Sequence, residues 1–180
     1  ADFADALGIA LRGDVVSVAH VRKRFNSVRV VDLASTRLGG PSEAHLAEAA
    51  SFLRGWVADN GIEPTRSSIA VDRSVTFLGT LPIPASAAAN ARAVVGYELD
   101  RLIPVPADAL YWSHLVRPVG TVGERVAVTV VAAPRLAVEE AATLAADAGL
   151  PLSAVTAEPL ALSDYVAFSG HPLAALLTRV

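Results

Sequence analysis

The stretch GYELDRLIPVPADALYW, residues 96–112, joins two kinds of structure. Its first part spaces charged residues among leucines, which is typical of an amphipathic helix. Pro104 and Pro106 then end that helix, because proline lacks a backbone N–H and restricts the residue before it. The apolar, aromatic residues that follow are typical of a strand. The stretch therefore predicts a helix, a rigid corner and a strand. We interpret the corner as structural, with a partner surface at its rim as the alternative.

The same unit extends on both sides of this stretch. Residues 76–84 predict a strand closed by proline, and residues 86–103 predict the helix. Downstream, the pattern predicts strands at 109–119 and 124–134 and then a helix at 135–150 that ends at Gly149. Together these segments form a β-α-β-β-α subdomain, which we place at residues 75–150.

The flanking residues predict a second, discontinuous subdomain at 1–74 and 151–180. Residues 7–34 read as a three-stranded meander whose apolar first strand is expected at the centre of a sheet. Ser42 is the expected N-cap of a helix that ends at Asn60 and Gly61. The pattern then predicts a strand at 67–72, another at 150–162 and a short helix at 160–170.

Composition excludes several classes of function. The chain has 180 residues, 53% of them hydrophobic and 18% charged, so it is long enough and apolar enough to fold. Its net charge of −3 disfavours a nucleic-acid binder. Cysteine is absent, and no apolar run approaches the ~20 residues that span a bilayer. We expect a soluble chain cut from a longer parent, because the sequence lacks methionine and its end carries no helix stop.

Catalytic motifs are missing. No GxSxG elbow or Walker loop occurs, and GTVG at 120–123 is expected to be a turn between strands. His45 and Glu48 share a helix face, but a lone pair of this kind is usually solvated surface. Glu98 and Asp100 are two residues apart and point to different sides of a helix. The sequence therefore predicts no catalytic residues, no metal and no cofactor.

The order of elements resembles the amino-terminal half of the actin-like proteins of bacterial secretion and pilus assembly, the GspL and PilM family. Residues 77–112 and 126–162 are similar to two blocks of that family, through Leu81, Pro82, Glu98, Pro104, Pro106, Tyr111 and the Glu158-Pro159 pair. The resemblance covers roughly residues 7 to 166. It implies an α/β fold: an actin-like, ribonuclease-H-type domain with the inserted β-α-β-β-α subdomain.

Nucleotide binding in the actin-like fold uses a Gly-Ile-Asp-x-Gly phosphate loop after the first strand. The matching residues here begin at Gly8, but Ala10 replaces the aspartate and Arg12 replaces the second glycine. Alanine cannot hold the water shell of a cation. The resemblance therefore implies a degenerate phosphate loop and favours the secretion-platform branch over the nucleotide-binding branch.

The resemblance implies a non-catalytic scaffold for type II secretion or type IV pilus assembly. It would dock the amino-terminal region of a cytoplasmic assembly ATPase and contact other inner-membrane platform proteins; a homodimer stays open. Its place would be the cytoplasmic face of the bacterial inner membrane, with a membrane-anchored parent. The alternatives are a nucleotide-binding PilM-like protein and a fragment of a sugar- or acetate-kinase-type enzyme. Arg92, Glu98 and Arg101 are the expected partner contacts, because their helix combines both charge signs beside an apolar stripe.

Overall fold

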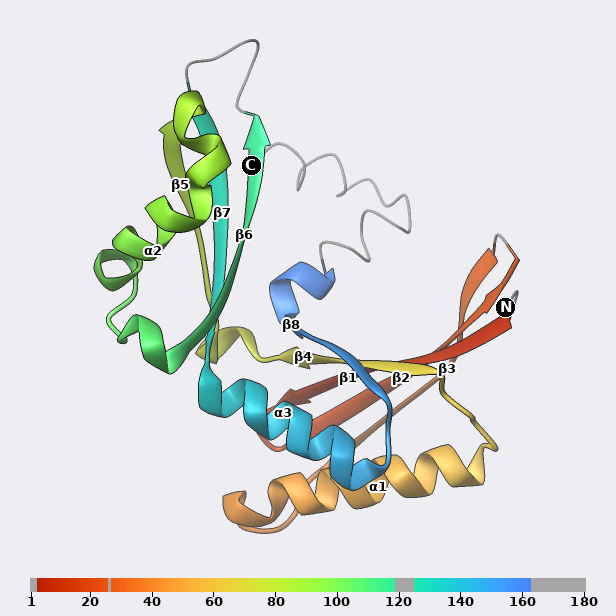
Figure 1. Cartoon of the computed structure of the whole chain (residues 1–180). Helices are drawn as coiled ribbons and strands as arrows, with labels where there is room; N and C mark the ends of the chain where they lie inside the picture. Colours follow the sequence, from red (N-terminus) through yellow and green to blue (C-terminus); the bar gives the residue numbers. More distant parts are fainter. Residues whose placement is uncertain (1–2, 26, 119–124, 163–180) are drawn as a thin grey trace. The chain divides into compact units, whose positions relative to one another are not determined.

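A computed structural model describes residues 3–25, 27–118 and 125–162 (Figure 1). The described chain is a mixed α/β protein with two separate sheets. One compact unit contains the chain up to Asp72 and the described residues from Glu139 on, and the other is Arg73–Val138. The GTVG turn and most of the helix expected at 160–170 lie outside the described residues.

The first unit contains a five-stranded sheet in the order β3-β2-β1-β4-β8. The antiparallel part consists of β1 (Phe3–Arg12), β2 (Val15–Arg24) and β3 (Ser27–Arg37). The parallel part adds β4 (Arg66–Val71) beside β1 and β8 (Leu152–Ala157) beside β4. The predicted meander is confirmed, and β1 lies at the centre of the sheet as its apolar sequence indicates.

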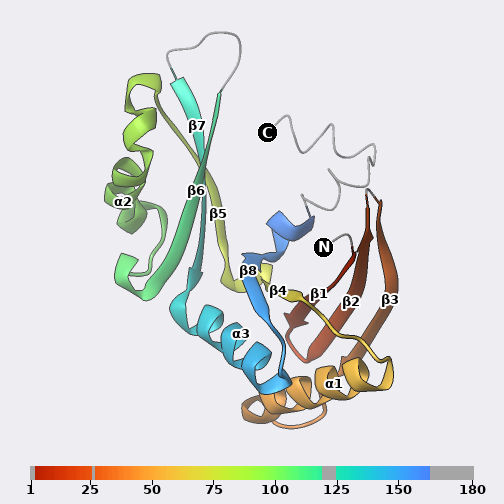
Figure 2. The same cartoon turned by 45° about the vertical axis from the view of Figure 1, so that its right-hand side comes forward.

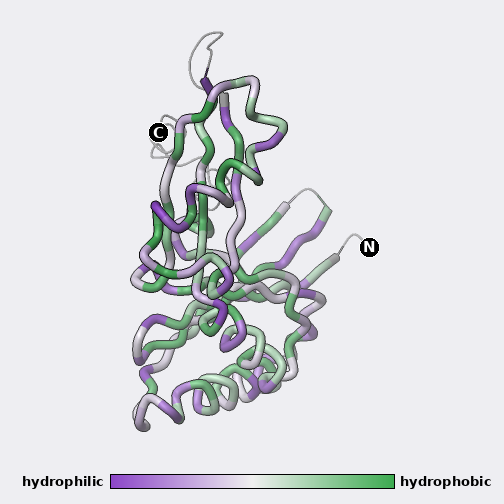
Figure 3. The backbone as a smooth tube through the Cα atoms, turned by 60° about the vertical axis from the view of Figure 1, so that its left-hand side comes forward, coloured by the Kyte–Doolittle hydropathy of each residue, from purple (hydrophilic) through white to green (hydrophobic). Residues whose placement is uncertain are grey.

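Two helices lie along one face of this sheet, α1 (His45–Asp59) and most of α3 (Arg135–Ala148) (Figures 1 and 2). Hydrophobic and hydrophilic residues alternate along both helices (Figure 3). Their apolar residues and every second residue of the strands form the buried core: Leu7, Ile9, Val16, Val18, Ala49, Ala50, Leu53, Ile69, Val71, Ala141, Leu144, Ala145, Ala148 and Ala157.

The start of α1 differs from the prediction. A short 3₁₀ turn at Ser42–Ala44 precedes the helix, and no side chain caps either element, so Ser42 is not the N-cap. The Glu48 carboxylate instead accepts the backbone N–H of Gly39 at 2.9 Å, which ties the preceding loop to the helix. The predicted end is confirmed, because α1 stops at Asp59 and Gly61 has a φ of 59°.

The second unit is a three-stranded antiparallel sheet in the order β5-β7-β6, with α2 (Ala91–Leu102) on one face (Figure 2). Its strands are β5 (Phe77–Pro84), β6 (Leu110–Pro118) and β7 (Arg125–Pro134), and a 3₁₀ turn at Ala85–Asn90 precedes α2. The buried core of this unit consists of Ile83, Ala91, Val95, Leu99, Ile103, Leu110, Val128, Val130 and Ala132.

The proline corner has the predicted role. Helix α2 ends at Leu102, and Ile103 already has extended backbone angles. Pro106 leads into a 3₁₀ turn at Ala107–Ala109, and β6 follows directly. The corner therefore converts helix into strand within a few residues, and both of its apolar flanks pack into the core of the second unit.

The boundary of the inserted segment differs from the prediction. Residues 75–150 were expected to form one subdomain, but the chain from Glu139 on, with most of α3, belongs to the first unit. The reason is the apolar stripe of α3, which is absent from the core of the second unit. Arg54 of α1 also donates a hydrogen bond to the carbonyl of Asp147. That the inserted segment folds separately stays a prediction.

Candidate functional site

The residues that were expected to form a degenerate phosphate loop lie in a strand. Gly8, Ala10 and Arg12 alternate along β1 and share the face opposite Leu7 and Ile9. Strand β1 continues through Arg12, and the hairpin to β2 consists of Gly13 and Asp14 alone, with a φ of 57° at Gly13. Phosphate loops bind through several converging backbone N–H groups. A two-residue hairpin directly after a continuous strand is a poor source of them.

Arg12 is engaged by an acidic side chain. Its guanidinium forms an ion pair with Glu158, the residue that directly follows β8. Residues 158–162 are helical, so Glu158 lies in a first helical turn, where a carboxylate is favourable. The position expected to match the second glycine of a phosphate loop therefore holds an arginine that is paired with a carboxylate. A phosphate at this corner would meet the negative charge of Glu158.

The histidine and glutamate of α1 have structural roles. Nε2 of His45 lies 3.0 Å from the carbonyl oxygen of Gly40, to which it donates its proton. Glu48 accepts the N–H of Gly39, as described above. Among residues 3–25, 27–118 and 125–162, no group of three histidine or acidic side chains lies close enough together to hold a metal ion.

A polar cluster that the sequence did not predict lies on the helix-covered face of the first sheet. Oδ1 of Asp5 accepts hydrogen bonds from Nε2 of His20 and from Nε of Arg22, both at 2.7 Å. The side chain of His20 is almost completely buried, with the residue only 3% exposed. Because Asp5 bridges a buried imidazole and a partly exposed guanidinium, the cluster is a structural network rather than an open site.

The pKa of Asp5 follows from this network. The hydrogen bond from Arg22 lowers the pKa of the Asp5 carboxyl below its ordinary value of 3.8. Partial burial acts in the opposite direction, and the hydrogen bond from His20 again lowers the pKa. Asp5 is therefore a carboxylate at neutral pH.

The three residues of α2 that were expected to contact a partner do not share one face of the helix. Arg101 donates to Glu98 at 3.1 Å, so these two side chains form an exposed pair one turn apart. The guanidinium of Arg92 lies 4.7 Å from the ring centre of Trp112 on β6, in a cation–π contact. Nine residues separate Arg92 from Arg101, which is about two and a half turns, so they leave α2 on opposite sides.

An exposed aromatic side chain adds to this face. Tyr97 on α2 is 85% exposed and lies on the side opposite the buried Ala91, Val95 and Leu99. Its neighbours along the helix include Arg101. The sequence contained a signal for it, because the helical register places this tyrosine on the polar side, where aromatic residues are unusual. Exposed tyrosine beside arginine is the composition that protein interfaces favour.

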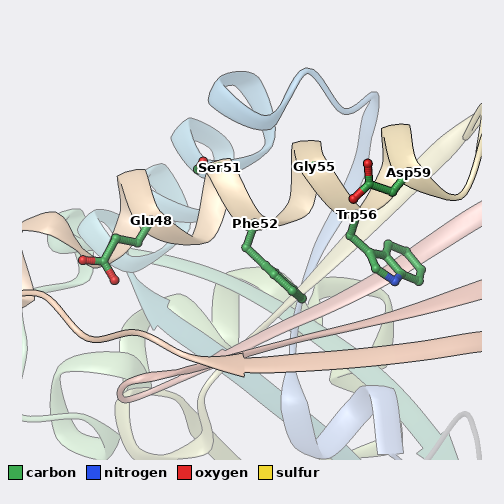
Figure 4. A pocket seen from close by; sticks show the side chains of 6 residues that line it. All are labelled: Glu48, Ser51, Phe52, Gly55, Trp56 and Asp59. Atoms are coloured by element: carbon green, nitrogen blue, oxygen red, sulfur yellow. The ribbon is translucent and has the colours of Figure 1, made fainter.

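An open depression of about 440 Å³ lies along α1 (Figure 4). Phe52 and Trp56 extend from the same side of the helix, and Glu48 and Asp59 stand at the two ends. The other lining residues are Ser51 and Gly55. All the lining residues come from one helix, so the depression is a feature of one side of α1.

Two solved structures with the same fold come from bacterial assembly machineries. A chain of the PilM–PilN type IV pilus biogenesis complex matches with a TM-score of 0.73 and 22% identity, over 91% of this chain and 51% of that chain. The cytoplasmic domain of EpsL, an inner-membrane component of the type II secretion system of Vibrio cholerae, matches with a TM-score of 0.57 and 14% identity. That match covers 85% of this chain and 57% of the other.

A protein of unknown function from Bacteroides thetaiotaomicron, described as having an actin-like ATPase fold, matches with a TM-score of 0.47 and 10% identity. That match covers 94% of this chain and 58% of the Bacteroides chain. The chain thus spans a little more than half the length of these structures. No protein-family model and no curated protein matches the sequence. The chain shares its fold with the chain of the PilM–PilN complex and with the EpsL cytoplasmic domain, which confirms the expected fold class.

Proposed function

We propose that the chain is a non-catalytic docking domain of an inner-membrane platform for type II secretion or type IV pilus assembly. The fold shared with the PilM–PilN complex and the EpsL cytoplasmic domain supports the class of machinery. The domain would act on the cytoplasmic side, as part of a membrane-anchored parent. No helix in the described ranges is long and apolar enough to cross a membrane.

The observation that carries the proposal is the Arg12–Glu158 ion pair at the degenerate phosphate loop. Without an aspartate at position 10, β1 lacks the loop carboxylate that would hold a metal–nucleotide, and the Glu158 carboxylate is bound to Arg12. With Arg12 paired to Glu158, the corner also lacks the positive potential that attracts phosphate. Function then rests on contacts with other proteins rather than on bond-making.

Nucleotide titration tests the non-catalytic part. Calorimetric titration of the chain with Mg-ATP is expected to give no saturable heat up to about 1 mM, which corresponds to less than about 4 kcal/mol of binding free energy. Arg12→Gly/Ala10→Asp, which rebuilds the loop residues, serves as the comparison variant. A micromolar dissociation constant for the unmodified chain would contradict the proposal and favour the nucleotide-binding alternative.

The partner we propose is the amino-terminal region of a cytoplasmic assembly ATPase, with other platform proteins as further contacts. The contact we propose is the exposed side of α2, defined by Tyr97, Glu98 and Arg101. These residues combine an exposed aromatic ring with charges of both signs. Arg92, which the sequence analysis also expected at a partner contact, is not part of the contact we propose, because its guanidinium lies over Trp112 on the other side of the helix.

Two variants test the contact on α2. Tyr97→Ala is expected to weaken ATPase binding at least about tenfold, because exposed tyrosines that become buried at interfaces contribute strongly to affinity. Glu98→Arg/Arg101→Glu should also weaken binding, while the reversed pair keeps the melting temperature nearly unchanged. Arg92→Ala is the matched control and should bind normally. If Arg92→Ala abolished binding while both other variants bound normally, the proposed contact would be wrong.

A further inference from the structure

Strand β3 forms an open edge of the five-stranded sheet. It contains 11 residues, Ser27–Arg37, and pairs along one side with β2. Among the described residues, nothing pairs with its other side. A long edge strand presents unpaired backbone groups to any strand of matching sequence. The composition of β3 therefore decides what this edge binds.

The edge is apolar at its centre. Val30 and Val31 are half-exposed, and Leu33 is 69% exposed. The register of β3 against β2 shifts at this point, since His20 pairs with Asp32 whereas Val21 pairs with Val30, so Val31 has no partner on β2. The Asp32 carboxylate accepts the N–H of Leu33 at 2.8 Å. The three apolar side chains thus lie exposed at a bulge in the edge.

Arg29 is a cation with no ion-pair partner among the residues that the structure describes. It lies directly opposite Arg22 on β2, and the guanidinium of Arg22 already binds Asp5. Like charges that face each other across a strand pair are destabilising. An anion supplied from outside the sheet would offset this repulsion.

We propose that a second copy of this chain supplies that anion by antiparallel pairing of β3 with β3 about a two-fold axis. Arg29 and Asp32 lie on the same face of the sheet, because their partners Arg22 and His20 lie two residues apart on β2. The bulge at Val31 makes this possible, since it shifts the alternation of faces by one residue. Residues that lie opposite each other in a sheet must share a face. A pairing that sets Arg29 opposite Asp32 of the second copy meets this requirement.

The register that pairs Arg29 with Asp32 also sets apolar residues of the two copies opposite one another. It sets Val28 opposite Leu33 of the second copy and Val30 opposite Val31. Val28 and Leu33 also share a face, because they pair with Lys23 and Ala19 on β2. Two-fold symmetry repeats each contact, so two Arg–Asp pairs flank an apolar centre. One edge strand is small beside the ~1,600 Å² of a standard interface, so the dimer is weak and depends on concentration.

Sedimentation equilibrium over a series of chain concentrations, up to about 1 mM, tests the pairing. The unmodified chain should shift from the mass of one chain toward twice that mass. Arg29→Asp and Asp32→Arg should each weaken association at least about tenfold, because each sets like charges opposite one another. The double variant Arg29→Asp/Asp32→Arg should regain it, since the opposite charges face again in reversed order.

Leu33→Lys and Leu136→Lys form a matched control. Both leucines are exposed to the same degree, 69% and 67%, but only Leu33 lies on β3. Leu33→Lys should abolish the dimer and Leu136→Lys should keep it, with circular dichroism confirming that each variant is folded. A chain that stays monomeric at all concentrations would overturn the proposal. So would a dimer that none of the β3 variants weakens.

Discussion

Leu53→Ala is expected to lower the free energy of unfolding of the first unit by about 3–5 kcal/mol. Leu53 is fully buried on α1, and truncating a buried leucine loses transfer free energy and leaves a cavity. Leu162→Ala is the matched control, because that leucine is exposed in the same unit and should change stability by less than about 0.5 kcal/mol. A loss below about 1 kcal/mol at Leu53 would contradict the packing described for α1.

The two tryptophans allow this loss to be assigned to a unit. Trp56 lies on α1 in the first unit and Trp112 on β6 in the second. Urea unfolding followed by fluorescence in a Trp112→Phe background reports on the first unit. Because two units need not unfold in one step, each tryptophan should be followed separately before a free energy is extracted.

Asp5→Ala is expected to destabilise the first unit by about 2–3 kcal/mol at neutral pH. The substitution removes the hydrogen-bond acceptor of His20, which is almost completely buried, and leaves that donor without its partner. The Asp5 side chain is 28% exposed, which keeps the loss below that of a fully buried ion pair. Asp5→Asn keeps an acceptor oxygen at the site and should lose less. Equal stability of the unmodified chain and Asp5→Ala would contradict the network.

The same substitution has a defined pH dependence. Because the pKa of Asp5 is lower in the folded chain than its ordinary 3.8, the ionised carboxylate stabilises the fold above that value. This stabilisation is lost as the pH falls through the folded pKa. The difference in stability between the unmodified chain and Asp5→Ala should therefore be largest near neutral pH and shrink below about pH 4. A difference that grew on acidification would reverse the sign expected from the Arg22 hydrogen bond.

Local patterns predicted the elements well, because each depends on nearby residues. The proline corner after Leu102 and the glycine ends of α1 and α3 follow from backbone chemistry that a sequence displays directly. The start of α1 was predicted less well, because Ser42 is a good cap by type whereas Glu48 reaches back to Gly39 through the fold. Local sequence patterns also could not predict the unit to which α3 belongs. That assignment depends on the core in which the apolar side of α3 packs.

The candidate site was predictable only in part. The departures at Ala10 and Arg12 are visible in the sequence, but the pairing of Arg12 with Glu158 joins residues that are distant along the chain. The Asp5 network likewise depends on the register of β1 against β2. On α2, the spacing of 3.6 residues per turn is enough to place Arg92 and Arg101 on opposite sides and Tyr97 on the exposed side. The sequence therefore contained this information.

The central claim is that this domain works by docking an assembly ATPase without a nucleotide. The most direct test is biolayer interferometry of the immobilised chain with the amino-terminal region of an ATPase encoded in the same secretion or pilus locus, in nucleotide-free buffer. We predict saturable binding that weakens as salt is added, because charges of both signs flank the proposed contact. Absence of binding to the unmodified chain at every salt concentration would contradict the claim.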